Sequence, residues 1–287
     1  MLAPLDTFLL DSFLKRSLEE DLGRTGDITT QALVAPDVIG TGAVHFRQKG
    51  RVCGLGVMQR LFSLLDSTVT FRIHHTDGTD VGHNTEVATL TGPAHALLTG
   101  ERVALNLLGR LSAIATLTQA CVRKAEPWGT RIADTRKTTP GLRYLEKWAV
   151  RTGGGVNHRF GLGDAVMIKD NHIAVTGSIT EAVRRARHHV GHMCKIEVEV
   201  DTIDQLEEIL SLPEKLWIDA VLLDNMTPDL LECAVQKVDG RLITEASGGI
   251  TPDTIATVAA TGVDVISLGF LTHSVTQRDV GLDLCLT

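Results

Sequence analysis

From Thr130 onward, short apolar runs alternate with helical patterns. The runs are followed by polar or glycine residues and have the length of buried strands. They are Thr130–Ala133, Ala165–Ile168, Lys195–Val200, Ile218–Leu223, Arg241–Ala246 and Asp264–Leu268. Between them, apolar residues recur at helical spacing, as at Ile179, Val183 and Ala186. The alternation predicts a parallel sheet of an α/β fold. At this length a barrel is the expected closure, irregular or incomplete because six strands are found.

The first part of the chain, residues 1 to about 112, has a different pattern and is expected to form a mixed domain of its own. Residues 113–287 then form the barrel domain, and the extreme C-terminus can pack back on the first domain. The expected elements are a helix over Leu5–Leu22 that ends at Gly23, strands over Gly42–Phe46 and Thr68–His74, and a helix over Gly100–Ala120 that links the two parts.

Three segments look like helix starts. Thr227-Pro228 and Thr251-Pro252 each place an N-cap residue before a proline at the first helical position. Arg136–Pro140 follows the strand Thr130–Ala133 and is also expected to open a helix. Backbone N–H groups at such a start attract anions.

Polar or glycine residues lie at the carboxyl ends of five successive strands. They are Lys169, Glu199, Asp224, Ser247-Gly248-Gly249 and Gly269. Parallel strands meet at one edge of the sheet, and barrel enzymes keep their chemistry at the carboxyl ends of their strands. One such residue would be weak support, but five favour an active site over coincidence.

The composition excludes several classes of protein. Hydrophobic residues make up 43% of the 287 residues, so a packed core is expected. The net charge of −7 argues against a nucleic-acid-binding surface. Five widely spaced cysteines favour reduced thiols. Because no signal peptide or membrane-length apolar run is found, we expect a cytoplasmic protein that does not contact membranes.

Against this acidic background, the stretch from Arg136 to Lys169 is strongly basic, with seven Lys and Arg against two acids. Lys147 and Arg151, four residues apart, are expected on a solvated helix face. Arg136, Lys137 and Thr138 instead favour an anion site, because Arg can bind a carboxylate with two hydrogen bonds while Lys supplies a point charge. A substrate with several negative groups fits this segment.

Two glycine motifs are candidates for close approach of a ligand to the backbone. Gly153-Gly154-Gly155 precedes His158-Arg159, which favours a ligand over a plain helix end. Ser247-Gly248-Gly249 lies between a strand and an expected helix, where small residues expose N–H groups to a phosphate. No GxGxxG, P-loop or zinc-spacing motif occurs.

The strand Lys195–Val200 alternates charged and apolar residues, so Lys195, Glu197 and Glu199 share one face. A structural Lys195–Glu197 ion pair is one interpretation. Glu199, nearest the carboxyl end, is the residue assigned to ligand chemistry. With Asp224 it could bind ribose hydroxyls or a Mg²⁺ carried by a pyrophosphate, directly or through water.

These segments, in this order, resemble the quinolinate phosphoribosyltransferase family over nearly the whole chain. The matching motifs are Glu20–Gly23, Gly26–Thr30, Gly100–Asn106, Asp134–Arg143, Gly153–Arg159, Lys169–His172, Glu197–Glu199, Leu223–Asn225, Ser247–Thr251 and Asp264–Ser267. The portion from Arg136 to His172 is the most specific.

The resemblance implies an N-terminal α/β sandwich domain followed by an irregular, incomplete α/β barrel, in a homodimer that can assemble further into a hexamer. It implies transfer of phosphoribosyl from phosphoribosyl pyrophosphate to quinolinate with loss of CO₂, as in NAD biosynthesis, with Mg²⁺ as cofactor. Quinolinate would meet Arg136, Lys137, Thr138, His158, Arg159 and Lys169, with Arg102 from the partner subunit. Ser247, Gly248, Gly249 and Gly269 would hold phosphate, and Lys137, Glu199 and Asp224 are the expected catalytic residues.

Two alternatives stay open. A related phosphoribosyltransferase could act on nicotinate or belong to a molybdenum-associated branch, although the intact Arg136–Arg143 motif and His158-Arg159 favour a dicarboxylate. A non-catalytic ligand-binding protein of the same fold would be expected to lack a key residue, and none is missing.

Overall fold

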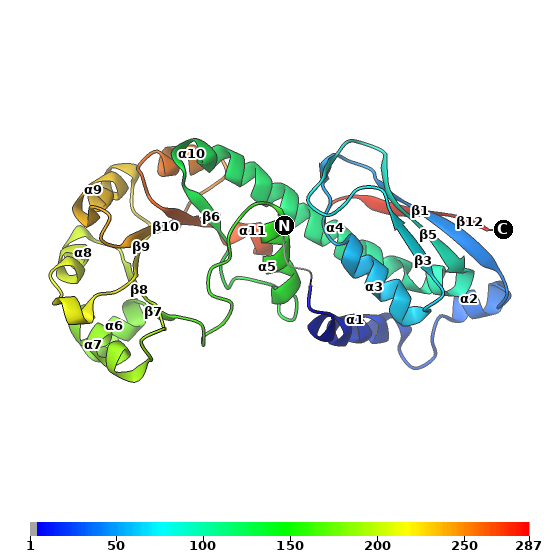
Figure 1. The fold of residues 1–287 in the computed structure, drawn as a ribbon, viewed down its shortest axis with the longest axis horizontal. Coiled ribbons are helices and arrows are strands. Elements are labelled where there is room, and N and C mark those ends of the chain that lie inside the picture. The colour runs from blue at the N-terminus through cyan, green and yellow to red at the C-terminus, as the bar shows by residue number, and fades with distance from the viewer. Residues whose placement is uncertain (1–4, 287) are drawn as a thin grey trace. The chain divides into compact units, whose positions relative to one another are not determined.

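The computed structural model describes residues 5–286, so the first four residues of the segment searched for a signal peptide lie outside it. The chain forms two compact units (Figure 1). One contains residues 1–118, 139–154 and 272–287, and the other contains residues 119–138 and 155–271. Within residues 5–286, no helix is both long enough and apolar enough to cross a lipid bilayer.

The first unit is built on an antiparallel sheet in the order β12-β1-β5-β3. Its strands are β1 (Ile39–Phe46), β3 (Thr70–Ile73), β5 (Thr85–Pro93) and β12 (Val280–Leu286), and a small second sheet pairs β2 (Gly50–Arg51) with β4 (Asp80–Val81). Alternate residues of β1 are buried, as expected for a sheet with one face on a core. The C-terminal strand β12 pairs along nearly the whole of β1 and so completes this sheet.

The helices of the first part of the chain include both predicted ones. They are α1 (Thr7–Leu22), α2 (Ile28–Leu33), α3 (Leu55–Leu65) and α4 (Ala94–Ala125), with a 3-10 turn at Glu126–Trp128. The helix α1 ends at Gly23, whose N–H donates to the carbonyl of Glu19 and whose φ of 54° suits glycine. The helix α4 extends beyond the predicted Gly100–Ala120 at both ends.

The second unit is built on a parallel sheet in the order β6-β11-β10-β9-β8-β7. Its strands are β6 (Arg131–Ala133), β7 (Val166–Ile168), β8 (Ile196–Val200), β9 (Ala220–Asp224), β10 (Ile243–Ser247) and β11 (Val265–Ser267). All six predicted strands are confirmed. Because β6 and β7 end the order, the described barrel is incomplete, as the pattern predicted.

Helices connect these strands, and α7, α8 and α9 lie along the outer side of the curved sheet (Figure 1). They are α6 (Asp170–Thr176), α7 (Ile179–His189), α8 (Ile203–Leu210), α9 (Pro228–Val238), α10 (Ile255–Ala259) and α11 (Phe270–His273), with a 3-10 turn at Glu214–Leu216. The Thr227-Pro228 pair does begin a helix, with Pro228 in its first turn.

Two predicted helix starts are wrong. The helix after Thr251-Pro252 begins only at Ile255, because Thr251 and Thr254 bond to each other in a turn. The segment Arg136–Pro140 opens no helix either, since α5 spans Arg143–Thr152. The segment Arg136–Pro140 therefore offers no helix N-terminus to an anion.

One further prediction fails at α5. Lys147 was placed on a solvated face but is 2% exposed, because α5 buries charged as well as apolar side chains. Among them, Glu146 accepts a hydrogen bond from Arg110 at 2.8 Å. Close packing requires the first glycine after α5, because a Cβ on Gly153 would lie 2.6 Å from the Ala115 carbonyl oxygen. The approach of a ligand to Gly153-Gly154-Gly155 stays a prediction.

Candidate active site

A cavity of about 330 Å³ lies in the second unit, at the carboxyl ends of the parallel strands. It is lined by Thr135, Arg136, Lys137, His158, Arg159, Met167, Lys169, Glu199, Leu222, Asp224, Glu245, Ser247 and Ser267. Four of the five predicted strand ends therefore supply their predicted residue to one space, and β11 contributes Ser267 in place of Gly269. The volume suits a small ligand.

Four cationic side chains line this cavity. Arg136 and Lys137 follow β6 and are exposed, whereas Arg159 is half-buried and Lys169 directly follows β7. Arg159 donates from Nη1 to the Ala165 carbonyl at 3.0 Å. Burial and then nearby Arg136 lower the pKa of Arg159, while Glu197 and Asp164 oppose this shift. An arginine in such a setting gains from an anionic ligand.

Three carboxylates also line the cavity, those of Glu199, Asp224 and Glu245. Lys169 donates from Nζ to Glu199, so the strand-end lysine and glutamate form an ion pair. Burial and the nearby Glu199 charge raise the pKa of Asp224, whose carboxylate also accepts a hydrogen bond from Asn225 at 2.6 Å. Glu199 and Asp224 border a second cavity of about 90 Å³, which Asp170 and Asp201 also line.

The loop after β10 has backbone geometry that requires glycine. Gly248 and Gly249 have φ of 85° and 63°, in the left-handed region. A Cβ on Gly248 would lie 2.9 Å from the backbone nitrogen of Asn225. The loop after Ser247 therefore packs closely against the backbone of Asn225, and Ser247 itself lines the cavity.

The cavity contains most of the predicted site residues. Those lining it are Arg136, Lys137, His158, Arg159, Lys169, Glu199, Asp224 and Ser247; those absent from its described lining are Arg102, Thr138, Gly248, Gly249 and Gly269. Arg102 lies on α4, where its guanidinium is 3.9 Å from Glu101 and its side chain is 67% exposed. Arg102 thus forms an ion pair with its neighbour in the chain.

Sequence reasoning missed a deeper layer of the site. Met167, Leu222 and Glu245 line the cavity two residues before Lys169, Asp224 and Ser247. Because side chains alternate along a strand, a residue two positions earlier points to the same face. The strand alternation that selected Glu199 could therefore have found this layer. Thr135 and Ser267, also in the lining, were missed as well.

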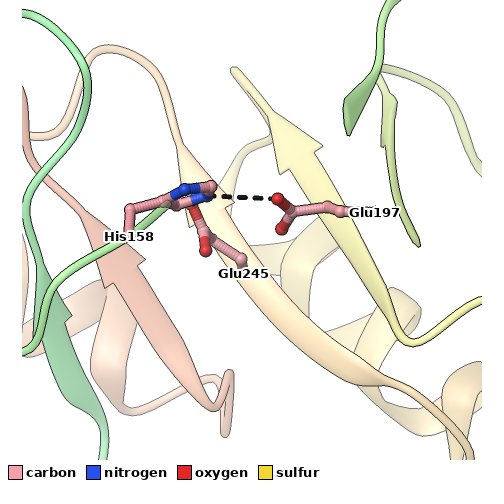
Figure 2. A group of neighbouring side chains, drawn as sticks. All are labelled: His158, Glu197 and Glu245. Atoms are coloured by element: carbon pink, nitrogen blue, oxygen red, sulfur yellow. Dashed lines mark ion pairs between the residues drawn. The ribbon is translucent and has the colours of Figure 1, made fainter. Parts of the chain in front are cut away.

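The deeper layer contains a cluster of His158, Glu197 and Glu245, of which Glu245 is buried and the other two are partly buried (Figure 2). Nε2 of His158 lies 3.1 Å from Glu197 Oε2 and 3.5 Å from Glu245 Oε1. Burial and then the Glu197 charge raise the pKa of Glu245 to about 7, with His158 and a Ser267 hydrogen bond opposing the shift. The possible Lys195–Glu197 pair is wrong, since Lys195 is exposed and precedes β8, and Glu197 pairs with His158.

Cations facing carboxylates at the carboxyl edge of a parallel sheet define a class of protein: an α/β enzyme with a pocket for a small, multiply charged anion. Comparison with known families specifies the class further. Residues 27–112 match the family model for the N-terminal domain of quinolinate phosphoribosyl transferase, and residues 114–283 match its C-terminal domain. The chain belongs to the quinolinate phosphoribosyl transferase family.

Individual relatives agree over nearly the full length. A probable nicotinate-nucleotide pyrophosphorylase (carboxylating) of Bacillus subtilis is 47% identical over 97% of this chain and 94% of its own. The nicotinate-nucleotide pyrophosphorylase (carboxylating) of Mycobacterium leprae is 42% identical over 94% of this chain and 95% of its own. The crystal structure of NadC from Streptococcus pyogenes matches with a TM-score of 0.94 at 38% identity, covering 100% of both chains.

Proposed function

We propose that this protein transfers the phosphoribosyl group of phosphoribosyl pyrophosphate to quinolinate, giving nicotinate mononucleotide, pyrophosphate and CO₂. The observation that carries the proposal is a cavity lined by four cations and three carboxylates, in a chain of this family. The names of the relatives from B. subtilis and M. leprae support the same reaction.

The cationic side of the cavity is the proposed binding site for quinolinate. Its two carboxylates would be met by Arg136, Lys137, Arg159 and Lys169, with Thr138 beside them. A half-buried guanidinium forms stronger charge-assisted hydrogen bonds than an exposed ammonium, because water screens it less. Arg159 is therefore the expected principal anchor, and exposed Lys137 contributes longer-range attraction.

The carboxylate side is the proposed site for the phosphoribosyl group and Mg²⁺. Burial and then the Glu199 charge raise the pKa of Asp224, so a cation between the two carboxylates is favoured. Their hard oxygen atoms suit Mg²⁺, so the residues fit the ion. Glu199 and Asp224 would hold it, directly or through water. Bound there, Mg²⁺ would neutralise negative charge on the pyrophosphate. The same carboxylates would orient the ribose hydroxyls.

The phosphate of the ribose is assigned to the loop Ser247–Gly249 and to Gly269. The left-handed backbone at Gly248 and Gly249 exposes N–H groups without side chains in front of them. Backbone N–H groups of this kind bind phosphate oxygen atoms.

In the proposed reaction, the ring nitrogen of quinolinate bonds to the ribose C1 as the bond from C1 to the pyrophosphate oxygen breaks. Glu199 and Asp224 stabilise the positive charge that develops at C1. The pyridinium ring then accepts the electron pair of the bond to the adjacent carboxylate, CO₂ leaves, and a proton adds at that carbon. No residue is required as a covalent nucleophile, so the protein contributes positioning and electrostatics.

Steady-state kinetics on two substrates test this function. We expect kcat/KM for quinolinate to exceed that for nicotinate by about a hundredfold, because nicotinate lacks one carboxylate for the basic side of the cavity. Release of CO₂ in step with pyrophosphate would accompany it. A preference for nicotinate would favour the related phosphoribosyltransferase, and quinolinate binding without CO₂ release would favour a non-catalytic protein.

Asp224→Asn separates the two halves of the proposed site. The substitution keeps shape but removes a negative charge, so we expect the KM for phosphoribosyl pyrophosphate to rise by about tenfold or more. Calorimetric titration of the free enzyme should give nearly unchanged quinolinate affinity. Asp229→Asn, at an exposed position on α9, is the matched control. If Asp224→Asn abolished quinolinate binding instead, the halves would be assigned wrongly.

We further infer a homodimer in which Arg102 of one subunit completes the quinolinate site of its partner. The family resemblance suggests this arrangement, and the high exposure of Arg102 leaves its guanidinium accessible. Assembly of such dimers into a hexamer would keep the same shared sites.

A further inference from the structure

The cluster of His158, Glu197 and Glu245 at the base of the cavity has two possible occupants. Its ligand atoms lie within 4.8 Å of one another, and one imidazole with two carboxylates is a donor set that a transition metal can use. The same three groups can instead share a proton. The hydrogen bonds of the imidazole ring distinguish the two cases.

The ring nitrogen Nδ1 of His158 accepts a hydrogen bond from the backbone N–H of Arg159 at 2.7 Å. An acceptor nitrogen carries no proton, so the neutral ring is protonated at Nε2. This N–H faces Glu197 and Glu245 (Figure 2). A metal would require the lone pair of Nε2 and a proton on Nδ1, which would then point at the Arg159 N–H. The cluster is therefore arranged for a proton.

The segment that carries His158 is held on its other side by Asp134. This carboxylate is fully buried and accepts hydrogen bonds from the His158 backbone N–H at 2.9 Å and from the Asn157 side chain at 2.6 Å. The backbone of residue 158 is thus fixed by Asp134 and its ring by the two glutamates. Arg159 is the next residue, so these contacts also fix the position of its backbone and the direction in which its side chain leaves the backbone.

We propose that Glu197 and Glu245 are positioning residues: Glu197 holds His158 by its ring N–H, with the Glu245 carboxylate 3.5 Å from the same nitrogen, and His158 holds Arg159 in the place where it binds a substrate carboxylate. The identity of that carboxylate as quinolinate's rests on the proposed function. Nδ1 of His158 contacts the Arg159 N–H and Nε2 contacts Glu197, so neither ring nitrogen is left to bind the substrate. His158 therefore acts through Arg159. Glu197 also acts on Arg159 directly, since its charge opposes the lowering of the Arg159 pKa by burial.

Nitrogen-15 NMR of the histidine rings tests the arrangement without any assumption about the reaction. The His158 signals are those missing from His158→Gln in protein labelled at histidine. Near neutral pH, we expect a neutral ring protonated at Nε2. A ring protonated at Nδ1, a doubly protonated ring, or one equivalent of tightly bound transition metal would overturn the proposal. This result stands even if quinolinate proves not to be the substrate.

Kinetics test the effect on Arg159. Glu197→Ala should raise the KM for quinolinate about tenfold, with kcat and the KM for phosphoribosyl pyrophosphate changed by less than about twofold. Glu197→Gln, whose amide oxygen still accepts the ring N–H, should recover most of the loss. Glu232→Ala, at an exposed position on α9, is the control.

Two kinetic outcomes would overturn the positioning role. Equal damage from Glu197→Gln and Glu197→Ala would mean that the charge, or a metal bound to it, acts directly. An unchanged quinolinate KM in Glu197→Ala and Glu245→Ala would mean that neither glutamate positions Arg159. Failure of the wild-type enzyme to use quinolinate would count against the proposed function alone, since the NMR test still decides the cluster.

Discussion

Arg159→Ala should reduce kcat/KM for quinolinate by about a thousandfold. The guanidinium lines the cavity, is half-buried, and has N–H groups left beyond the one bound to Ala165. Loss of two charge-assisted hydrogen bonds of about 2 kcal/mol each corresponds to roughly that factor. The KM for phosphoribosyl pyrophosphate should change much less, because Glu199 and Asp224 bind the other substrate in the proposed arrangement.

Two further variants show whether burial and geometry cause this effect. Arg159→Lys keeps a positive charge but loses the planar fork, so an intermediate loss is expected. Lys137→Ala removes an exposed cation from the same cavity and should cost only about tenfold, or about 1.4 kcal/mol. An equal loss in Lys137→Ala and Arg159→Ala would contradict the assignment of Arg159 as principal anchor. Thermal unfolding of each variant controls for loosening of the segment after Arg159.

The local sequence pattern was sufficient to predict the strands of the second unit and the site residues at the carboxyl ends of those strands. All six strands were found because apolar runs between polar ends reflect burial in a parallel sheet. Their carboxyl ends then place Lys169, Glu199, Asp224 and Ser247 at one edge, whatever the details of packing. These features depend on residues close in sequence.

The failed predictions depend on residues distant in sequence. Thr138-Thr139-Pro140 resembles a helix start, but the Thr139 N–H donates to buried Glu146, and Arg110 also donates to that carboxylate. Likewise, alternation could place Glu245 beneath Ser247, yet its partner His158 comes from a separate segment between β6 and β7. No local pattern shows such a contact. The buried charges of the site were therefore harder to predict than its exposed ones.

Arg102→Ala and Arg159→Ala should each be strongly impaired alone and should restore activity when combined. In the proposed homodimer, each site takes Arg159 from one chain and Arg102 from the other. A mixed dimer then contains one site with both defects and one site with neither. If half of the dimers are mixed, about a quarter of all sites are intact, and activity should recover to about one quarter of wild type.

The opposite assignment gives a different result from the same mixture. If Arg102 served the site of its own chain, every site would keep one defect, and mixing the two variants would restore nothing. Arg102 is 67% exposed and absent from the described lining of its own chain's cavity, which favours recovery. A surface arginine that only pairs with Glu101 predicts a third outcome, in which Arg102→Ala alone is nearly fully active. Native mass spectrometry would establish the fraction of mixed dimers, so that a lack of recovery in their presence would exclude the shared site.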